Sequence, residues 1–502
     1  MKKNLFERSL FLFLIPAFFL MHNYNELFGF LLLKQITHYA FIIYLLIILF
    51  YLLISILIRS RIKSALIIFF ISIFILFFGP IHSFIKMVST QRILSSYKVV
   101  LPLSILLLSW LTRKIIRSKS SLSKTVRWLN LTMIILVCWE LISGIVNYSA
   151  WKGSGNLIYP EKPICNHYAS KNIPDSLKPD IYFLVFDEYT NNKTLEALWH
   201  FKNGEITQWL QEHGFFVANH SAANYPCTFF SLSSTFNMDY LDPHKGTDAT
   251  SARNILMGNQ SLSNNETFCT LQKEGYSIQF LAPFRNSISE NGLGHYFDFL
   301  INDQLWMQTL PGNIEADIGW KFFTKRQIKE VLHHNMMHLQ EKAAVNSRII
   351  NQIKKLSDHS GDNRPNLIYG HFMITHEPNV FDSIGRFEPQ QKNASVTEIF
   401  RTYTTEIVYA NKVMRELVSC IQAKNKQAII IIEGDHGFKE FTSEQMKHYG
   451  YPNFFAAFFP DKNYSLLKDQ MTPVNIFRII LNKYFSQNLP MLKDSMVDVK
   501  LY

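Results

Sequence analysis

A short stretch near the C-terminal end of the chain holds side chains that are well suited to bind a metal ion. Residues 427–437 read QAIIIIEGDHG, in which four isoleucines lead into Asp435 and His436. A continuous apolar run bounded by polar residues and glycine is typical of a strand buried on both faces of a parallel sheet. A carboxylate beside an imidazole nitrogen suits Zn²⁺, Mn²⁺ or a similar divalent ion. The stretch therefore predicts half of a metal site at a strand end, although a plain polar turn has the same composition.

Two further predicted strands end in residues that could complete this site. The strand IYFLVF is followed by Asp187 and Glu188, and a strand predicted over 367–374 carries His371 and is followed by His376. In open α/β sheets, ligands bind outside the carboxyl ends of the strands. We therefore expect these polar clusters to lie close together, although each is weak evidence by itself.

The candidate nucleophile is a hydroxyl in the segment NYPCTFFSLSS at 224–234. Pro226 fixes the backbone ahead of Cys227 and Thr228, and an apolar-periodic helical pattern follows. A hydroxyl at a helix start is commonly only an N-cap. In the functional interpretation Thr228 coordinates a metal ion and attacks phosphorus, because coordination lowers the pKa of a bound hydroxyl. The helix N-terminus would also favour the anionic group that is transferred.

These residues require a scaffold in which strands alternate with helices. Further strands are expected at 215–218, 276–281 and 453–459, and helices at 194–212, 229–236, 266–274, 325–356, 396–423 and 473–484. Such alternation favours an α/β domain whose mostly parallel sheet is covered on both faces. We expect this soluble domain to occupy residues 180–502.

Ahead of this domain the sequence predicts a membrane-spanning part. Apolar stretches that could span a bilayer, which takes about 20 residues, lie at 10–21, 38–58, 65–85, 99–116 and 129–146. The first stretch is short, but it shows no small-residue cleavage site and more spans follow, so we interpret it as a retained helix. The sequence thus predicts a polytopic α-helical membrane domain of about five helices over residues 1–150, followed by a juxtamembrane linker at 151–179.

The positive charges set the expected orientation. The net charge is +11, and Lys and Arg gather at the N-terminus and after the second and fourth apolar stretches. The positive-inside rule places these segments in the cytoplasm and the chain after Tyr148 outside it. No nucleic-acid-binding signature accompanies the charge. The five cysteines show no CxxC spacing, and one or two disulfides could form if the downstream part is extracytoplasmic.

Taken together, these segments resemble the alkaline phosphatase superfamily, in particular its membrane-anchored sulfatase-like branch, which contains the lipoteichoic acid synthases and the lipid A phosphoethanolamine transferases. The matching pieces are FDEYT at 186–190, NYPCTFFSLSSTFNMDYL at 224–241, GHFMITHEPNVFD at 370–382, EGDHG at 433–437 and PVNIFRIILNKYF at 473–485. Members of this branch carry several spans ahead of an extracytoplasmic catalytic domain. The resemblance implies a bacterial cytoplasmic (inner) membrane protein with a periplasmic or extracytoplasmic catalytic domain.

The resemblance also implies a role for each candidate residue. The implied ligands of a divalent ion, Zn or Mn, are Asp187, Thr228, Asp435 and His436, with Glu188 and His371 as additional candidates. Thr228 is the implied nucleophile. His376 matches a histidine that lines the substrate pocket, and as a second catalytic residue it would bind the phosphate or help to protonate a leaving group. One departure matters: Cys227 is not part of the C-x-P-x-R motif in which Cys-type sulfatases modify their cysteine. This absence argues against sulfatase chemistry on Cys227.

Three functions follow from this reading. The first is transfer of a phosphoryl-alcohol group, such as phosphoethanolamine or phosphoglycerol, from a membrane phospholipid donor to a surface glycan or lipid acceptor such as lipopolysaccharide. A phosphothreonine at Thr228 would be the intermediate. The second keeps the same residues but uses water as the acceptor, as in a membrane-anchored phosphodiesterase or sulfatase-like hydrolase. The third is a non-enzymatic scaffold in envelope assembly, against which the retained ligand set argues.

Overall fold

The chain forms two compact units. The computed structural model describes residues 9–26, 33–88, 95–154, 178–241, 258, 261–262, 265–284, 305–318, 325–358, 364–390, 395–439 and 448–497. Unit 1 groups Met1–Gly153 with Asp298–Glu330, and unit 2 groups Ser154–Phe297 with Val331–Tyr502. Residues 305–318 of this segment therefore group with the N-terminal helices, although they lie far downstream in sequence. The domain boundaries expected from the sequence stay a prediction.

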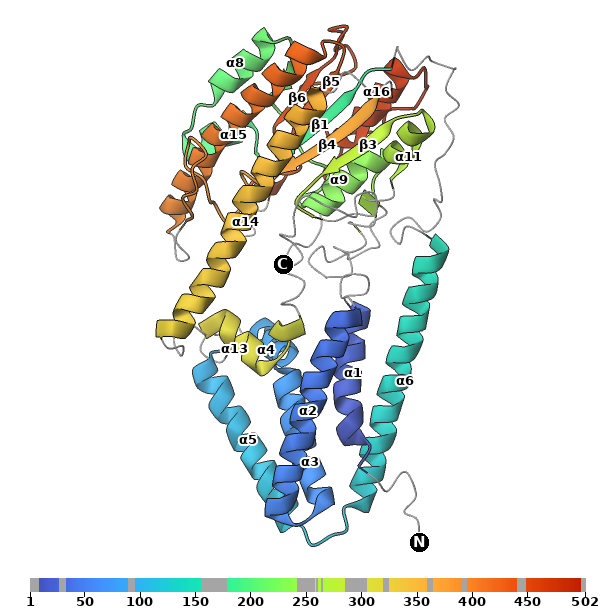
Figure 1. Cartoon of the computed structure of the whole chain (residues 1–502), viewed down its shortest axis with the longest axis vertical. Helices are drawn as coiled ribbons and strands as arrows, with labels where there is room; N and C mark the ends of the chain where they lie inside the picture. The colour runs from blue at the N-terminus through green and yellow to red at the C-terminus, as the bar shows by residue number, and fades with distance from the viewer. Residues whose placement is uncertain are drawn as a thin grey trace. The chain divides into compact units, whose positions relative to one another are not determined.

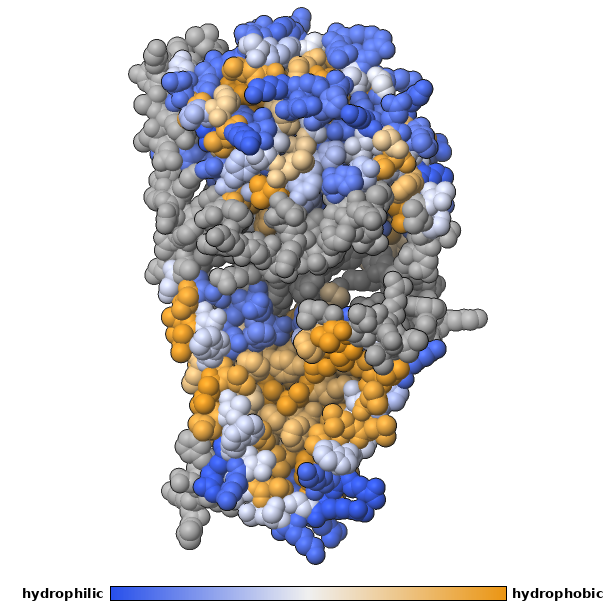
Figure 2. Space-filling model, turned by 180° about the vertical axis from the view of Figure 1, so that it is seen from behind, coloured by the Kyte–Doolittle hydropathy of each residue, from blue (hydrophilic) through white to orange (hydrophobic). Residues whose placement is uncertain are grey.

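Unit 1 is helical in its described part (Figure 1). Its helices are α1 (Phe11–Glu26), α2 (Leu33–Ile58), α3 (Arg61–Leu76), α4 (Phe78–Val88), α5 (Tyr97–Arg117), α6 (Ser123–Ser154) and α13 (Leu310–Ile318). Three stretches are long and apolar enough to cross a membrane, namely Ile36–Ile58, Tyr97–Arg117 and Ser123–Ser149. Their apolar side chains face outward: Phe41 on α2 is 69% exposed, Leu106 on α5 65% and Trp139 on α6 69%. Figure 2 shows apolar side chains gathered over the helices of unit 1.

The stretch predicted as one span over 65–85 is broken in the structure. α3 and α4 meet at a bend of 56° and would make a fourth span only if the bent pair is counted as one. Pro80 lies in the first turn of α4, and a proline has no N–H with which to continue the ladder of the preceding helix. The N–H of Gly79 donates instead to the carbonyl of Gln308 at 2.8 Å. The stretch at 10–21 lies on α1, which has 16 residues and is not among the candidate spans.

Unit 2 is built around a six-stranded mixed sheet with strand order β2-β6-β5-β1-β4-β3. The strands are β1 (Ile181–Phe186), β2 (Phe216–Ala218), β3 (Ser277–Leu281), β4 (Asn366–Phe372), β5 (Ile429–Glu433) and β6 (Phe455–Phe458). The four strands β5, β1, β4 and β3 run parallel, and β6 and β2 add to this block in antiparallel fashion. The predicted fold class, a helical membrane part followed by an α/β domain with a mostly parallel sheet, is confirmed.

Helices cover both faces of this sheet (Figure 1). They are α7 (Asn192–Trp199), α8 (Gly204–Glu212), α9 (Thr228–Asn237), α11 (Glu266–Lys273), α14 (Lys325–Ser357), α15 (Val396–Lys424) and α16 (Ile476–Tyr484), the last preceded by a 3₁₀ turn at Pro473–Asn475. The alternate residues Tyr182, Leu184 and Phe186 of β1 pack in a core with α8, α14 and α15. Their neighbours in β1 pack in a second core with α9, α11 and α16. Burial on both faces explains why the central strands read as unbroken apolar runs.

Three details differ from the sequence expectation. The helix predicted over 194–212 is two helices, because His200 takes the left-handed conformation with a φ of 53° and ends α7. β4 ends at Phe372, so His376 lies in the loop after the strand. Helix α13 was not expected. In addition, Cys269 is disulfide-bonded, whereas Cys138, Cys227 and Cys420 are free.

Candidate active site

The ends of β1 and β5 bring two carboxylates to one edge of the sheet. β1 and β5 are adjacent and parallel, with Ile181 opposite Ile429 and Val185 opposite Glu433. Continuing this register by two residues sets Asp187 level with Asp435. Both side chains are fully buried. The expectation that these strand ends meet assumed that the two strands are parallel neighbours. The folded sheet pairs them in this way.

The glycines of the EGDHG stretch allow its tight approach to neighbouring backbone. A Cβ on Gly434 would lie 2.1 Å from the carbonyl oxygen of Tyr189, and one on Gly437 would lie 2.3 Å from that of Tyr449. Both distances are far below van der Waals contact, so only glycine fits. The loop is thereby held against the segment that follows β1, which sets the position of Asp435 and His436 between the two glycines.

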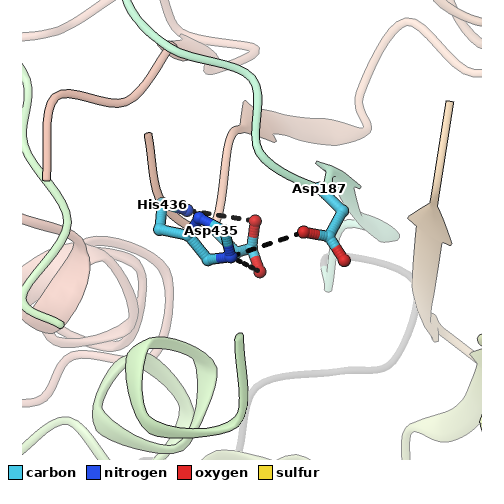
Figure 3. Close-up of side chains that lie close together, drawn as sticks. All are labelled: Asp187, Asp435 and His436. Atoms are coloured by element: carbon cyan, nitrogen blue, oxygen red, sulfur yellow. Dashed lines mark hydrogen bonds and ion pairs between the residues drawn. The ribbon is translucent and has the colours of Figure 1, made fainter. Parts of the chain in front are cut away.

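Asp187, Asp435 and His436 form a cluster that could hold a metal ion. One ligand atom from each residue lies within 4.8 Å of the other two. The Nε2 atom of His436 lies 3.5 Å from Oδ1 of Asp187 and 3.6 Å from Oδ2 of Asp435. Figure 3 shows the three side chains turned toward one another. The Nδ1 atom of His436 lies 2.8 Å from the carbonyl of Gly437, and donation there leaves the Nε2 lone pair directed into the cluster.

The lone pairs in this cluster fit a divalent ion. Among the described residues, Asp187 Oδ1 and Asp435 Oδ2 are buried and receive no hydrogen bond. Buried carboxylate oxygens are rarely left without a partner, because an unpaired buried charge is costly. Two such oxygens beside an imidazole nitrogen make the mixed O/N set that Zn²⁺ or Mn²⁺ accepts. The residues present therefore fit the metal expected from the sequence, without fixing which ion binds.

The two carboxyl groups differ in acidity. Burial disfavours the charged form of Asp187, but the neighbouring imidazoles of His376, His371 and His436 hold its pKa well below its ordinary value. Burial, and then the negative charge of Asp187, raises the pKa of Asp435. A cation between the two groups would relieve this repulsion and favour ionisation of both.

Thr228 lies beside the cluster at the first residue of α9. Its Oγ1 atom lies 3.4 Å from Nε2 of His436, and its side chain is buried. The hydroxyl of Ser231, one turn along α9, donates to the carbonyl of Asp435 at 2.6 Å. The helix and the EGDHG loop are therefore tied together, which places the Thr228 hydroxyl and the helix N-terminus at the candidate metal site.

The segment ahead of Thr228 is held by the C-terminal end of the described chain. The carbonyl of Asn224 accepts from the N–H of Val497 at 2.9 Å, and its side chain donates to the carbonyl of Ser495 at 3.0 Å. Its side-chain oxygen accepts from the N–H of Val474 at 3.0 Å. These bonds fix the backbone that leads into the candidate nucleophile.

The remaining predicted residues lie around this cluster but not in it. His371 lies with Nε2 3.1 Å from Oδ2 of Asp187 and Nδ1 2.7 Å from the hydroxyl of Tyr369. It therefore contacts a candidate ligand, and both of its nitrogens are engaged. Glu188 has a φ of 64°, and its Oε1 accepts from the N–H of Lys439 at 2.8 Å. Its side chain thus contacts the loop after His436, and Glu188 is not one of the three clustered residues.

His376 occupies the loop after β4. Its Nδ1 contacts the carbonyl of Glu377, and its Nε2 lies 3.3 Å from Nζ of Lys439. Burial, together with the cations of Lys439 and Lys342, lowers the pKa of His376 to about 3, although the negative charge of Asp187 opposes this shift. The imidazole is therefore neutral here and accepts a hydrogen bond from the ammonium.

Sequence reasoning missed several residues at this site. Lys439 gives no local signal, because a lysine three residues after a histidine is ordinary in a loop. Lys342 is buried in α14, and its ammonium donates to the carbonyls of His376 and Pro378. A lysine on the apolar face of a helix was a visible signal for a buried charge. Glu433 could also have been recognised from the sequence, because it is the last residue of a buried strand. Its burial, and to a smaller extent the negative charge of Asp435, raises the pKa of Glu433 well above the ordinary value.

Comparison with known proteins gives a family match in sequence. A sequence model of the sulfatase family, described as "Sulfatase", matches residues 199–473, more than half of the chain. The matched range contains Thr228, His371, His376, Asp435 and His436, and Asp187 precedes it. No curated protein matches the chain.

Solved structures show distant similarity. The zinc complex of the C-terminal periplasmic domain of EptC from Escherichia coli is 12% identical with a TM-score of 0.41, covering 66% of this chain and 92% of that one. The lipooligosaccharide phosphoethanolamine transferase EptA from Neisseria meningitidis, an integral membrane protein, is 11% identical with a TM-score of 0.39, covering 93% and 95%. The lipoteichoic acid synthase LtaP from Listeria monocytogenes is 12% identical with a TM-score of 0.37, covering 65% and 77%. Similarity at this level carries no argument, so the family rests on the sequence match.

Proposed function

This chain belongs to the sulfatase family and is an enzyme of the sulfatase-like type, and on that premise we propose that it transfers a phosphoryl-alcohol group. The donor is a membrane phospholipid, the group is of the phosphoethanolamine or phosphoglycerol type, and the acceptor is a glycan or lipid of the cell envelope. The observation that carries the proposal is the Thr228 hydroxyl at the start of α9, 3.4 Å from Nε2 of His436 in the candidate metal cluster.

The properties of Cys227, the residue before Thr228, argue that the nucleophile is the threonine and not the cysteine. Cys227 lacks the surrounding proline and arginine of the Cys-type sulfatase motif. Burial raises the pKa of its thiol to about 12, so the reactive thiolate is not formed near neutral pH. Thr228, in contrast, has its hydroxyl beside the metal cluster. We therefore assign the nucleophile to Thr228 and not to Cys227.

The reaction takes two steps on this residue. The Thr228 hydroxyl gives up its proton as its oxygen attacks phosphorus, an O–P bond forms, and the bond from phosphorus to the lipid alcohol breaks. The lipid alcohol takes up a proton and leaves, and the phosphoryl-alcohol group stays on Thr228 as a phosphothreonine diester. A hydroxyl of the acceptor then loses its proton and attacks this phosphorus, the O–P bond to Thr228 breaks, and the Thr228 oxygen takes up a proton, which restores the hydroxyl. The N-terminal end of α9 favours the negative charge of the group at phosphorus.

The other residues hold and orient the groups that react. Asp187, Asp435 and His436, with Thr228, would hold a divalent ion, which when bound lowers the pKa of the hydroxyl and stabilises charge on the phosphoryl oxygens. His371 holds Asp187 in place. His376 is neutral, so we assign it to orientation in the substrate pocket as a hydrogen-bond acceptor, and not to protonation of the leaving alcohol.

The membrane part supports a lipid donor. Three candidate spans anchor the chain, and anchoring confines the enzyme and a lipid substrate to one plane, which raises their effective concentration. The disulfide at Cys269 supports an oxidising compartment for unit 2. We propose that the protein lies in a bacterial cytoplasmic membrane with its catalytic unit on the outer side.

The proposal is tested by searching for the covalent intermediate. Full-length protein is loaded with Zn²⁺ or Mn²⁺ in liposomes that contain headgroup-labelled phosphatidylethanolamine or phosphatidylglycerol, and the peptide containing Thr228 is analysed by mass spectrometry. We expect a labelled phosphoryl-alcohol adduct on Thr228 in the wild type. Thr228→Val should lack the adduct and lose about 10³-fold or more in donor turnover, since nothing replaces the nucleophile. Cys227→Ser is the neighbouring control and should keep the adduct.

The fate of the label decides between acceptors. With an envelope glycan or lipid acceptor present, label on that acceptor supports transfer. Label released only as a soluble headgroup phosphate, with the acceptor unlabelled, would show a hydrolase and contradict the proposed acceptor. An adduct that persists in Thr228→Val would contradict Thr228 as the nucleophile.

A further inference from the structure

The turn after β1 places a backbone N–H against one of the candidate metal ligands. Glu188 is the second residue after β1 and has a φ of 64°. Its N–H donates to Oδ1 of Asp435 at 3.0 Å, and the N–H of His436 donates to the same oxygen at 3.0 Å. Oδ1 is therefore held by two backbone donors that come from different segments of the chain.

These two bonds determine which oxygen of Asp435 remains for a metal ion. Among the described residues, Oδ2 receives no hydrogen bond, and it lies 3.6 Å from Nε2 of His436. The His436 N–H belongs to the next residue and moves with Asp435. The Glu188 N–H, in contrast, follows directly after Asp187 in the chain. It therefore ties the carboxylate of Asp435 to the segment that carries the other candidate carboxylate.

The backbone conformation that presents this N–H is an unfavourable one. A residue with a Cβ rarely takes a φ near +60°, because the Cβ approaches the following carbonyl oxygen. Such a conformation persists only where the surrounding structure enforces it. If Glu188 relaxed to a negative φ, its N–H could not keep its place while Tyr189 and Thr190 kept theirs. The geometry of the metal cluster thus depends on whatever holds this turn.

Tyr403 on α15 contacts the backbone of the turn at two points. Its hydroxyl donates to the carbonyl of Glu188 at 2.7 Å and accepts from the N–H of Thr190 at 3.2 Å. A hydroxyl has one proton and two lone pairs, so both bonds form together. The tyrosine is buried, and its ring centroid lies 5.2 Å from that of Trp199 and 4.8 Å from that of Phe438. The packing of α15 therefore fixes the place of this hydroxyl.

Other contacts hold the side chains of the turn. Oε1 of Glu188 accepts from the N–H of Lys439 at 2.8 Å, and the hydroxyl of Thr190 donates to the carbonyl of Pro452 at 2.9 Å. These contacts do not involve the carbonyl of Glu188, which the Tyr403 hydroxyl binds. Loss of that hydroxyl should therefore loosen the left-handed turn without unfolding the segment.

We propose that Tyr403 is a positioning residue for the metal site. Its hydroxyl holds the left-handed turn at Glu188, which keeps the Glu188 N–H on Oδ1 of Asp435 and thereby fixes the spacing between Asp435 and Asp187. Tyr403 touches neither the ion nor the substrate, and it acts as the outer hydrogen-bond partners of metal ligands commonly do. This inference rests on the proposed function only in taking a divalent ion as the ligand of the cluster.

The test measures zinc binding and needs no turnover. The zinc dissociation constant of full-length protein in detergent is measured by competition with a chelator, and the thermal unfolding midpoint of the metal-free protein is measured beside it. Tyr403→Phe removes only the hydroxyl and should weaken zinc binding by about 10-fold. Tyr409→Phe changes a half-buried tyrosine on the same helix and should bind zinc as the wild type does. A merely structural role would lower the midpoint and leave the dissociation constant unchanged.

A second substitution tests the route through Glu188. Glycine takes a positive φ without a steric penalty, so Glu188→Gly no longer needs the hydroxyl to hold the turn. In a Glu188→Gly background, adding Tyr403→Phe should change the zinc dissociation constant by less than about threefold. An undiminished loss in that background would show that Tyr403 does not act through the left-handed turn, and would overturn the inference.

The remaining outcomes also decide. The inference is overturned if Tyr403→Phe binds zinc within about twofold of the wild type. If Tyr403→Phe does not fold, Glu188→Val is compared with Glu188→Asn, since both lack Oε1 but only asparagine readily takes a positive φ. Valine should then bind zinc about 10-fold more weakly than asparagine, and equal binding would overturn the inference. Zinc binding that depends on Tyr403, in a protein that forms no adduct on Thr228, would contradict the proposed function and leave the positioning role intact.

Discussion

At the scale of single residues, the site depends on side chains that orient other side chains. His371 shows this most clearly. It was a candidate ligand by sequence, but Nε2 hydrogen-bonds Asp187, and Nδ1 lies 2.7 Å from the Tyr369 hydroxyl. A ligand lone pair therefore does not remain on this ring. We assign His371 to the positioning of Asp187, which is the second sphere of contacts that commonly supports metal ligands.

The role of His371 predicts a graded loss of metal affinity. His371→Ala should weaken Zn²⁺ binding by about 10- to 100-fold, because Asp187 loses the hydrogen bond that orients it. His436→Ala should weaken binding more than His371→Ala, because it removes a ligand. The dissociation constants are measured by competition with a zinc chelator in the full-length protein. His220→Ala, which removes a surface histidine paired with Asp469, is the control and should bind zinc as the wild type does. Equal losses for His371→Ala and His436→Ala would contradict the assignment and indicate that His371 is itself a ligand.

At the scale of elements, two helices hold the loop that carries His376. α14 supplies Lys342, which donates to the carbonyls of His376 and Pro378. α15 supplies Glu406, which accepts from the N–H groups of Val380 at 2.6 Å and Phe381 at 3.0 Å. The buried ammonium satisfies carbonyls and the buried carboxyl satisfies N–H groups. The two helices therefore fix the loop after β4 from two sides, because their charged side chains hydrogen-bond its backbone C=O and N–H groups.

Glu406 gives this arrangement a pH dependence. Burial raises its pKa from 4.5 to about 7, although Lys342 and the donors to its oxygens oppose the change. The folded protein therefore holds a proton that the unfolded chain releases between these values, so stability falls as the pH rises through this window, by on the order of 3 kcal/mol. Glu406→Gln removes this contribution. The difference in thermal unfolding midpoint between about pH 5 and about pH 8 should then shrink by on the order of 5 °C.

A matched control lies on the same helix. Glu416 on α15 is half-exposed and pairs with Lys354 at the surface. Glu416→Gln should leave the pH dependence of the midpoint unchanged, because an exposed ion pair contributes little to stability. If Glu406→Gln and wild type show the same dependence, Glu406 does not hold a proton in the folded state.

At the scale of the whole molecule, the charges around α5 and α6 determine the expected membrane side. The basic residues at the end of α5 and the start of α6 are Lys114, Arg117, Lys124 and Arg127. The positive-inside rule places this connection in the cytoplasm, so α6 leads to the outer side whether or not α1 spans the bilayer. The expected side of unit 2 thus does not depend on the short first helix.

Cysteine labelling tests this topology. In a background with Cys138, Cys227 and Cys420 changed to Ser, a single cysteine is introduced as Ser120→Cys or Lys468→Cys. A membrane-impermeant thiol reagent applied to intact cells with a permeabilised outer envelope should label position 468 and not 120, because the cytoplasmic membrane shields the connection between α5 and α6. Detergent should make both positions reactive. Labelling of 120 alone in intact cells would reverse the proposed orientation.

The sequence by itself determined the elements and the family. Its apolar patterns predicted the strands of unit 2 and the long helices α2, α5, α6, α14 and α15, because these patterns arise from neighbours along one strand or helix. The polar residues after β1 and β5 could be recognised as candidate ligands, since parallel strands end at one edge of a sheet. Asp187, Asp435 and His436 were all named in this way. The family followed from the order of the motifs.

Only the tertiary structure decided which side chains meet. Register and loop path turned Glu188 toward the Lys439 backbone, placed His371 behind Asp187, and brought Lys439 between two imidazoles. They also grouped α13 with the N-terminal helices. These contacts join residues far apart in sequence and depend on the packing of both sheet faces, so no local pattern encodes them. The sequence thus identified the residues that could act, and the packed fold determined the partners that direct them.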